Sequence, residues 1–149
     1  MSKFFKLFAT LILSTLVLGC AQVPLNKVTQ SGKPERLFTS AKATDVKGKM
    51  IDRCSMAGLQ VDERGTNTLI CSKTLSGGDA VIAQIAIGNS YSTTPEQKVS
   101  FVITQRGNDV FVMATSIWIE TQMAFGQTRR QDITNNKQIN DIQNFLDSM

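Results

Sequence analysis

The chain has 149 residues, a length that accommodates one domain rather than two. Hydrophobic residues make up 42% and charged residues 19%, which is typical of globular proteins and excludes the disordered class. The chain has no histidine, so the sequence lacks the commonest metal ligand, the usual general base and every Ser-His or Cys-His nucleophile. The net charge of +4 includes Lys3 and Lys6; without them 14 basic and 12 acidic groups leave +2, which does not predict nucleic-acid binding.

The N-terminal segment MSKFFKLFATLILSTLVLGC combines two lysines with an apolar run from Leu7 to Leu18. This run is shorter than the ~20 apolar residues of a membrane span and fits the core of a signal peptide. It ends in Val17-Leu18-Gly19-Cys20, which resembles the lipobox of bacterial lipoproteins. The alternatives are an ordinary secretory signal with an unrelated cysteine, or an uncleaved anchor.

The resemblance implies that residues 1–19 are removed as a signal peptide and that Cys20 becomes a lipidated amino terminus. In this family the cysteine thiol receives a diacylglyceryl group and the new amino group an acyl chain such as palmitate. Two or more chains anchor a protein stably, whereas one chain does not. Ala21 in place of aspartate implies the outer membrane, with the protein facing the periplasm.

Residues 20–36 are expected to form the lipidated terminus and a flexible tether, because this stretch shows no period and contains Pro24, Pro34 and Gly32. Residues 37–149 are expected to form a single domain. Basic residues outnumber acidic ones from Gln22 to Arg53. This excess could hold the domain near anionic headgroups, or it could belong to a solvated linker and helix surface.

Two further cysteines, Cys54 and Cys71, remain once Cys20 carries lipid. In an oxidising envelope compartment they are predicted to form a disulfide, with free buried thiols as the alternative. A redox-active site is not indicated, because the chain has no Cys-x-x-Cys motif.

The folded part begins with a predicted helix over residues 45–57, where apolar residues recur at three- and four-residue spacing. Thr44 or Asp45 is the expected N-cap, and Gly58 fits the left-handed position after the last turn. A hairpin is predicted next, with strands over 59–63 and 69–71 joined by the turn at 64–67.

Three more strands are predicted over residues 81–87, 99–104 and 110–122, with a loop at 88–95 and a tight turn at 106–109. The last strand carries apolar residues on both parities. Because this strand is also long, we expect a bend or a bulge near Ala114-Thr115-Ser116.

The chain ends in a predicted amphipathic helix from about Asn135, with Thr134 or Asn135 as the cap and Gln138 completing a capping box. The fold class is therefore α+β: an antiparallel meander of about five strands packed with an N-terminal and a C-terminal helix. This order of elements is similar to the helix-grip arrangement of several envelope lipoproteins, including an accessory lipoprotein of the outer-membrane β-barrel assembly machinery.

Candidate chemistry is sparse, and no catalytic residue, metal site or cofactor is predicted. Asp62 and Glu63 are adjacent in a strand and point to opposite faces. The charged stretch Arg129–Asp132 could bind an anion, but a solvated loop explains it more simply. The sequence therefore predicts a protein that is not an enzyme.

Two functions remain. The first is a membrane-anchored envelope lipoprotein that acts as an interaction or assembly module and binds an envelope protein through its sheet or a strand edge. The second is a lipoprotein that binds a lipid or another small apolar ligand in a groove between sheet and helix. Thr115, Ser116 and Gln122 around Trp118 would suit the rim of such a groove, although Trp118 also fits a core position.

Overall fold

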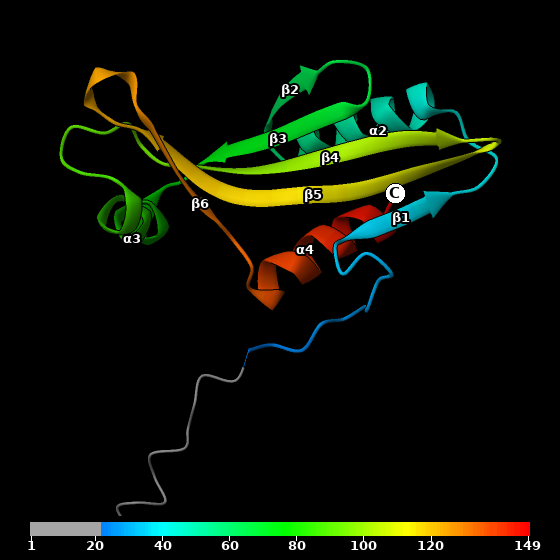
Figure 1. Ribbon diagram of the computed structural model, residues 1–149, viewed down its shortest axis with the longest axis horizontal. Coiled ribbons are helices and arrows are strands. Elements are labelled where there is room, and N and C mark those ends of the chain that lie inside the picture. Colours follow the sequence, from blue (N-terminus) through cyan, green and yellow to red (C-terminus); the bar gives the residue numbers. More distant parts are fainter. Residues whose placement is uncertain (1–21) are drawn as a thin grey trace, which may run out of the picture.

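A computed structural model describes residues 22–149 of the chain. Cys20 and the predicted signal peptide lie outside the described residues. Within them the α+β class is confirmed: an antiparallel sheet is packed with a helix near each end of the domain (Figure 1). The strands are β1 (Glu35–Phe38), β2 (Gln60–Arg64), β3 (Thr68–Thr74), β4 (Glu96–Arg106), β5 (Asp109–Gln122) and β6 (Thr128–Asp132). The helices are α2 (Ala43–Met56), α3 (Gly77–Ile87), the short 3-10 helix η1 (Ala124–Gly126) and α4 (Asn136–Asp147).

The sheet has the order β1-β5-β4-β3-β2, and β6 also pairs with β5. Strands β2 to β5 are neighbours in chain order, as expected for a meander, whereas β1 returns to the far side of β5. Strand β5 joins the two parts of the sheet, because its first half pairs with β1 and its second half pairs with β6. Two of these strands were not predicted. Glu35 and Arg36 of the expected tether belong to β1, and the expected loop Arg129–Asp132 belongs to β6.

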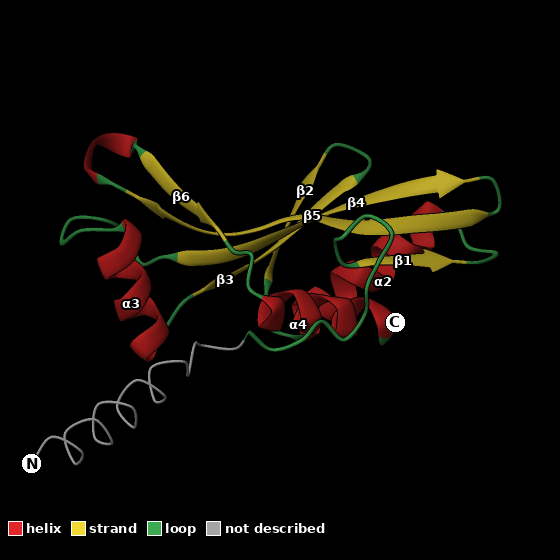
Figure 2. Ribbon diagram, turned by 60° about the horizontal axis from the view of Figure 1, so that its bottom comes forward, coloured by secondary structure: helices red, strands yellow, loops and turns green. Residues whose placement is uncertain are grey.

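The three α-helices all lie on one side of the sheet, as Figure 2 shows. The core lies between the sheet and the pair α2 and α4. Its largest fully buried side chains include Met50 of α2, Phe101 of β4 and Leu146 of α4. Because side chains alternate along a strand, the residues between these core positions point to the other side of the sheet, which we call the helix-free face.

The predicted bulge in β5 is confirmed. Ser100 pairs with Ser116 and Phe101 pairs with Ala114, so Thr115 is the extra residue. The extra residue switches the parity of the strand. Val110, Val112 and Ala114 point toward the helices before the bulge, and Ile117 and Ile119 do so after it, which explains why both parities of this strand are apolar.

The predicted strand over residues 81–87 is wrong, because Gly77–Ile87 forms helix α3. The run AVIAQIAI is apolar at almost every position, so neither a two-residue nor a 3.6-residue period stands out in it. Its three alanines favour a helix, Asp79 lies favourably in the first turn, and Gly88 follows the last one.

The two terminal helices follow the prediction more closely. Helix α4 is capped by the Asn135 side chain, which accepts a hydrogen bond from the backbone N–H of Gln138 at 3.0 Å. Helix α2 begins earlier than predicted, with Lys42 at the N-cap in place of Thr44 or Asp45. Gly58 has φ +73° after the last turn, as expected for a left-handed residue at this position.

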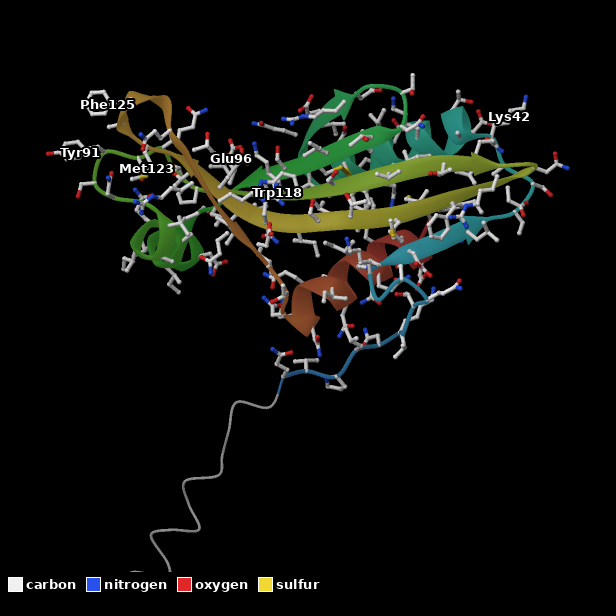
Figure 3. The ribbon with its side chains drawn as sticks, viewed as in Figure 1. Lys42, Tyr91, Glu96, Trp118, Met123 and Phe125 are labelled. Carbon is white, nitrogen blue, oxygen red and sulfur yellow. A yellow bond between two sulfur atoms is a disulfide. The ribbon has the colours of Figure 1, made fainter. Side chains whose placement is uncertain are left out.

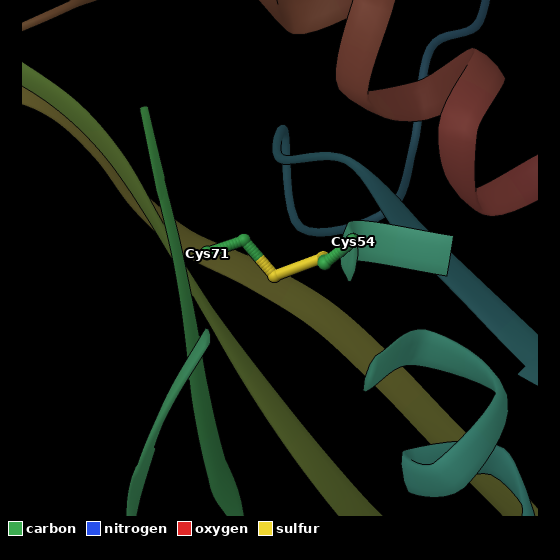
Figure 4. The surroundings of a disulfide bond; sticks show 2 residues. All are labelled: Cys54 and Cys71. Atoms are coloured by element: carbon green, nitrogen blue, oxygen red, sulfur yellow. A yellow bond between two sulfur atoms is a disulfide. The ribbon is translucent and has the colours of Figure 1, made fainter. Parts of the chain in front are cut away.

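The disulfide between Cys54 and Cys71 is present and joins α2 to β3 (Figure 4). Both cysteines are fully buried in the core. The bond therefore ties the N-terminal helix to an inner strand of the sheet.

The segment before β1 runs along α4. The Asn140 side-chain amide accepts a hydrogen bond from the backbone N–H of Asn26 and donates one to the carbonyl of Pro24, both at 2.8 Å. Asn136 donates to the carbonyl of Val23 at 2.8 Å. Part of the stretch expected as a flexible tether is therefore held against the domain.

Candidate interaction site

The helix-free face divides into an apolar strip and a charged cluster. The strip crosses β1, β5, β4 and β3, and its members are neighbours by strand register: Leu37 opposite Phe111, Met113 opposite Val102, and Ile70 diagonal to Val102. Leu37 is 49% exposed, whereas Ile70 is buried. The guanidinium of Arg106 lies 3.9 Å from the centre of the Phe111 ring and partly covers the strip.

The charged cluster lies where β4, β5 and β6 run side by side. It consists of two rungs of directly opposed residues: Lys98–Trp118–Asp132 and Glu96–Glu120–Arg130. We call these six residues the Trp118 cluster, and Figure 3 shows Glu96 and Trp118 in it. Glu96 and Glu120 face each other directly, an arrangement of like charges that is unfavourable unless a cation lies between them.

Lys98 is that cation. Its ammonium lies 2.6 Å from Glu120 and 3.0 Å from Glu96. The Trp118 indole donates a second hydrogen bond to Glu120 at 2.6 Å. These contacts fix the positions of both glutamates and of the indole ring.

Burial by itself would lower the pKa of Lys98, but hydrogen bonds and attraction to Glu120 and Glu96 outweigh this effect and raise the pKa. Burial would likewise raise the pKa of Glu120. Hydrogen bonds from Lys98 and Trp118, with the positive charges of Lys98 and Arg130, instead lower it. Lys98 and Glu120 are therefore both charged at neutral pH, and the attraction between them outweighs the cost of their partial burial.

Arg130 covers the indole from the outside. Its guanidinium lies 4.2 Å from the centre of the Trp118 ring and also binds the carboxylate of Asp132 at 2.8 Å. Trp118 is consequently only 5% exposed although no helix covers it. The indole expected at a groove rim is thus covered by charged side chains, whereas Thr115 and Ser116 border a separate hollow of about 370 Å³ beside Ile133.

The large apolar side chains with the highest exposed fractions lie outside the strands. Helix α3 contacts the sheet through Ala83 and Ile87, and its opposite side carries Val81, Ile82 and Ile85, which are 58%, 67% and 80% exposed. We call these three residues the outer face of α3. The exposed apolar side chains of residues 81–87, a stretch predicted as a strand, therefore belong to a helix.

A groove of about 630 Å³ runs between α3, the helix side of the sheet and the start of α4. Its walls are mixed. Apolar side chains such as Ile82, Ile119 and Ile133 alternate with polar ones such as Gln97 and Gln131. The groove is open along one side, with Asn135, Lys137 and Gln138 of α4 at its border.

Of the residues singled out from sequence, Cys54 and Cys71 meet as predicted, whereas Cys20 lies outside the described part. Asp62 pairs with Arg64 and Glu63 with Lys47, so the two acids are apart as expected. The Trp118 cluster was missed because Arg130 and Asp132, the two residues that β6 contributes to it, were expected to lie in a loop. The outer face of α3 was missed because a helix was taken for a strand; the alanine content and the flanking glycines were the available signals.

Comparison with protein-family models, curated proteins and solved structures finds no match to this chain. Within residues 22–149 no helix is long and apolar enough to cross a bilayer. The same residues contain no group of three or more metal-ligating side chains placed to hold a metal ion.

Proposed function

We propose that the protein is a lipoprotein of the bacterial cell envelope, anchored through Cys20, that acts as a non-catalytic interaction module. The lipobox-like ending Val17-Leu18-Gly19-Cys20 supports the anchor. The Cys54–Cys71 disulfide supports an oxidising compartment, since such bonds persist outside the cytoplasm. Ala21 after the cysteine favours the outer membrane with the domain in the periplasm, and the lack of histidine favours a role other than catalysis.

The main support for the interaction role is the composition of the helix-free face. It combines an apolar strip with an adjacent cluster in which Arg130 stacks on Trp118. Protein interfaces use this composition: tryptophan and arginine are enriched among the residues that dominate binding energy, and charged groups form the border. A partner that displaced Arg130 from the indole would gain access to the largest aromatic surface of this face. We infer that the partner is another envelope protein.

The anchor is tested by replacing Cys20 with serine. We expect Cys20→Ser to release the protein from membranes or to leave its leader uncut, because serine cannot form the thioether to the lipid. A Cys54→Ser, Cys71→Ser variant is the matched control and should remain in the membrane fraction. Normal processing and unchanged membrane fractionation of Cys20→Ser would contradict the anchor.

The interaction surface is tested by crosslinking in intact cells. Photoreactive residues at Leu37 and Val102 sample the helix-free face, and one at Met56, at the exposed end of α2, is the control. We expect one protein adduct from both sheet positions, reduced by Arg130→Ala, and none from Met56. Capture only from Met56 or from residues 22–34 would contradict the proposed surface.

A second candidate is a carrier of a small apolar ligand, and the groove beside α3 favours it. Its volume of about 630 Å³ lies within the range of ligand sites, and Ile82, Ile119 and Ile133 offer apolar contacts. Organic extraction of the purified protein followed by mass spectrometry distinguishes the two candidates. A stoichiometric lipid supports the carrier, whereas a ligand-free domain that still crosslinks a protein supports the interaction module.

A further inference from the structure

Helix α3 is apolar on the side that faces away from the sheet as well as on the side that packs against it. At 3.6 residues per turn, Val81, Ile82 and Ile85 fall together, opposite the buried Ala83 and Ile87. A helix that is apolar all round is normally buried on every side. In the described structure all three side chains are more than half exposed, and Thr94 and Pro95 of the following loop border one edge of this face beside Val81 and Ile85.

The outer face has no polar group to desolvate. The sole charged residue of α3, Asp79, lies in its first turn, on the border of the groove rather than among the three exposed side chains. The side-chain amide of Gln84 turns away to the following loop, where it donates hydrogen bonds to the carbonyl of Asn89 and to the Ser92 hydroxyl. An apolar medium can therefore cover this face without leaving a donor or acceptor unpaired.

The start of the described chain lies on the same side of the molecule. Val23 is bound to Asn136 in the first turn of α4, and residues of that turn border the groove whose other wall is α3. In Figure 2 the beginning of the described chain, α4 and α3 all lie on the helix side of the sheet. Only Ala21 and Gln22 lie between Cys20 and Val23, and the three steps along the chain from Cys20 to Val23 span at most about 11 Å.

We propose that the outer face of α3 rests on the lipid bilayer as a second membrane contact. This inference rests on the proposed lipid anchor at Cys20. An anchor so close to α4 leaves little freedom to lift the domain, so the helix side must face the bilayer. Tethering raises the local concentration of the bilayer surface, so three side chains suffice for a contact that would be weak for a free protein. The helix-free face then points away from the membrane and is accessible to a partner.

The test uses the full, lipidated protein reconstituted into vesicles of phosphatidylethanolamine and phosphatidylglycerol that contain no other protein. An environment-sensitive fluorophore is attached to Ile85→Cys, and in a separate preparation to Leu37→Cys, an exposed apolar residue on the opposite face. Both positions are exposed, so neither substitution threatens folding. The native cysteines do not react, because Cys54 and Cys71 are paired and Cys20 carries the lipid.

We expect the probe at position 85 to shift its emission to the blue and to be quenched severalfold more strongly by nitroxide-bearing lipids than the probe at position 37. Equal quenching at both positions would overturn the contact. An emission shift that depends on the number of protein copies per vesicle would also overturn it, since the face would then bind a second copy. Failure of the anchor itself gives a different result: the chain stays in solution and Cys20 takes up a second fluorophore.

Discussion

The two halves of strand β5 meet different helices and use their apolar side chains differently. In the first half, Val110 and Val112 are completely buried under α2 and α4, together with Met50 and Leu146. In the second half the cover is α3, which contributes only Ala83 and Ile87 and leaves its outer face exposed. One end of the sheet is therefore closed by its own helices, and the other carries a helix that buries Ala83 and Ile87 but leaves Val81, Ile82 and Ile85 exposed.

Apolar content alone therefore does not locate a core. Helix α3 is more apolar along its length than α2 or α4, yet it buries less. The α2–α4 end gains its stability from side chains that interlock on both sides of the layer. Stability and surface contact are therefore expected to respond to different substitutions.

The largest expected effect lies in the closed half. Phe101 is almost completely buried, and its ring centre lies 5.9 Å from that of Phe145. Phe101→Ala should lower the free energy of unfolding by about 3–5 kcal/mol through lost burial and the cavity left behind. Ile85→Ala, on the outer face of α3, should change it by less than about 0.5 kcal/mol. Urea denaturation measures both changes. Similar losses of unfolding free energy in the two variants would contradict the difference in packing between the two ends of the sheet.

The second effect concerns the bond between α2 and β3. Cys54 and Cys71 are separated by 17 residues, and loss of such a crosslink costs on the order of 3 kcal/mol. We expect the double variant Cys54→Ala, Cys71→Ala to unfold at markedly lower urea concentration than the oxidised protein. Adding a reductant should destabilise the parent protein but not the variant. A variant as stable as the parent would show that side-chain packing alone, without the disulfide, stabilises the α2–α4 end.

The third effect is electrostatic and lies on the helix-free face. Lys98→Met removes the cation between Glu96 and Glu120 and should cost about 1.5 kcal/mol at neutral pH. Lys137→Met is the matched control, since its exposed pair with Asp141 should contribute almost nothing.

The stability cost of Lys98→Met is expected to depend on pH. Because the folded pKa of Glu120 is lowered, its contribution is complete above the ordinary glutamate value near 4.5 and is lost as the pH falls through the folded pKa. Because the folded pKa of Lys98 is raised, its contribution is complete below the ordinary lysine value near 10.5 and is lost as the pH rises through the folded pKa. The cost of Lys98→Met should therefore be constant from mildly acidic to mildly alkaline pH and shrink in acid. A cost independent of pH down to pH 3 would contradict the assignment.

The smallest effect lies at the tip of the open end, where Phe125 is fully exposed with φ +69° (Figure 3). Residues other than glycine adopt this backbone conformation only with strain, and the strain is smaller for asparagine than for phenylalanine. Phe125→Asn should raise the free energy of unfolding by about 0.5 kcal/mol. Thermal denaturation is sensitive enough to detect it, and a loss of stability would mean that the ring has a packing role.

The sequence predicts the two helices and the disulfide of the closed end but misses strand β1 there, and it predicts the open end poorly. The spacing of Val46, Met50 and Cys54 indicates a buried helix face, and Asn135 with Gln138 indicates the start of α4, because these signals are local. The nature of residues 77–87 depends instead on whether a neighbouring strand is available, which a uniformly apolar run does not reveal. The Trp118 cluster depends on the register of three strands, and register is not a local property.

The orientation proposed for both faces depends on Cys20 being a lipidated amino terminus. The mass of the N-terminal peptide of the protein purified from membranes tests this dependence. We expect a peptide that begins at Cys20 and carries a diacylglyceryl group with an additional acyl chain. A peptide that begins at Met1, or one that begins near residue 20 without lipid, would contradict it.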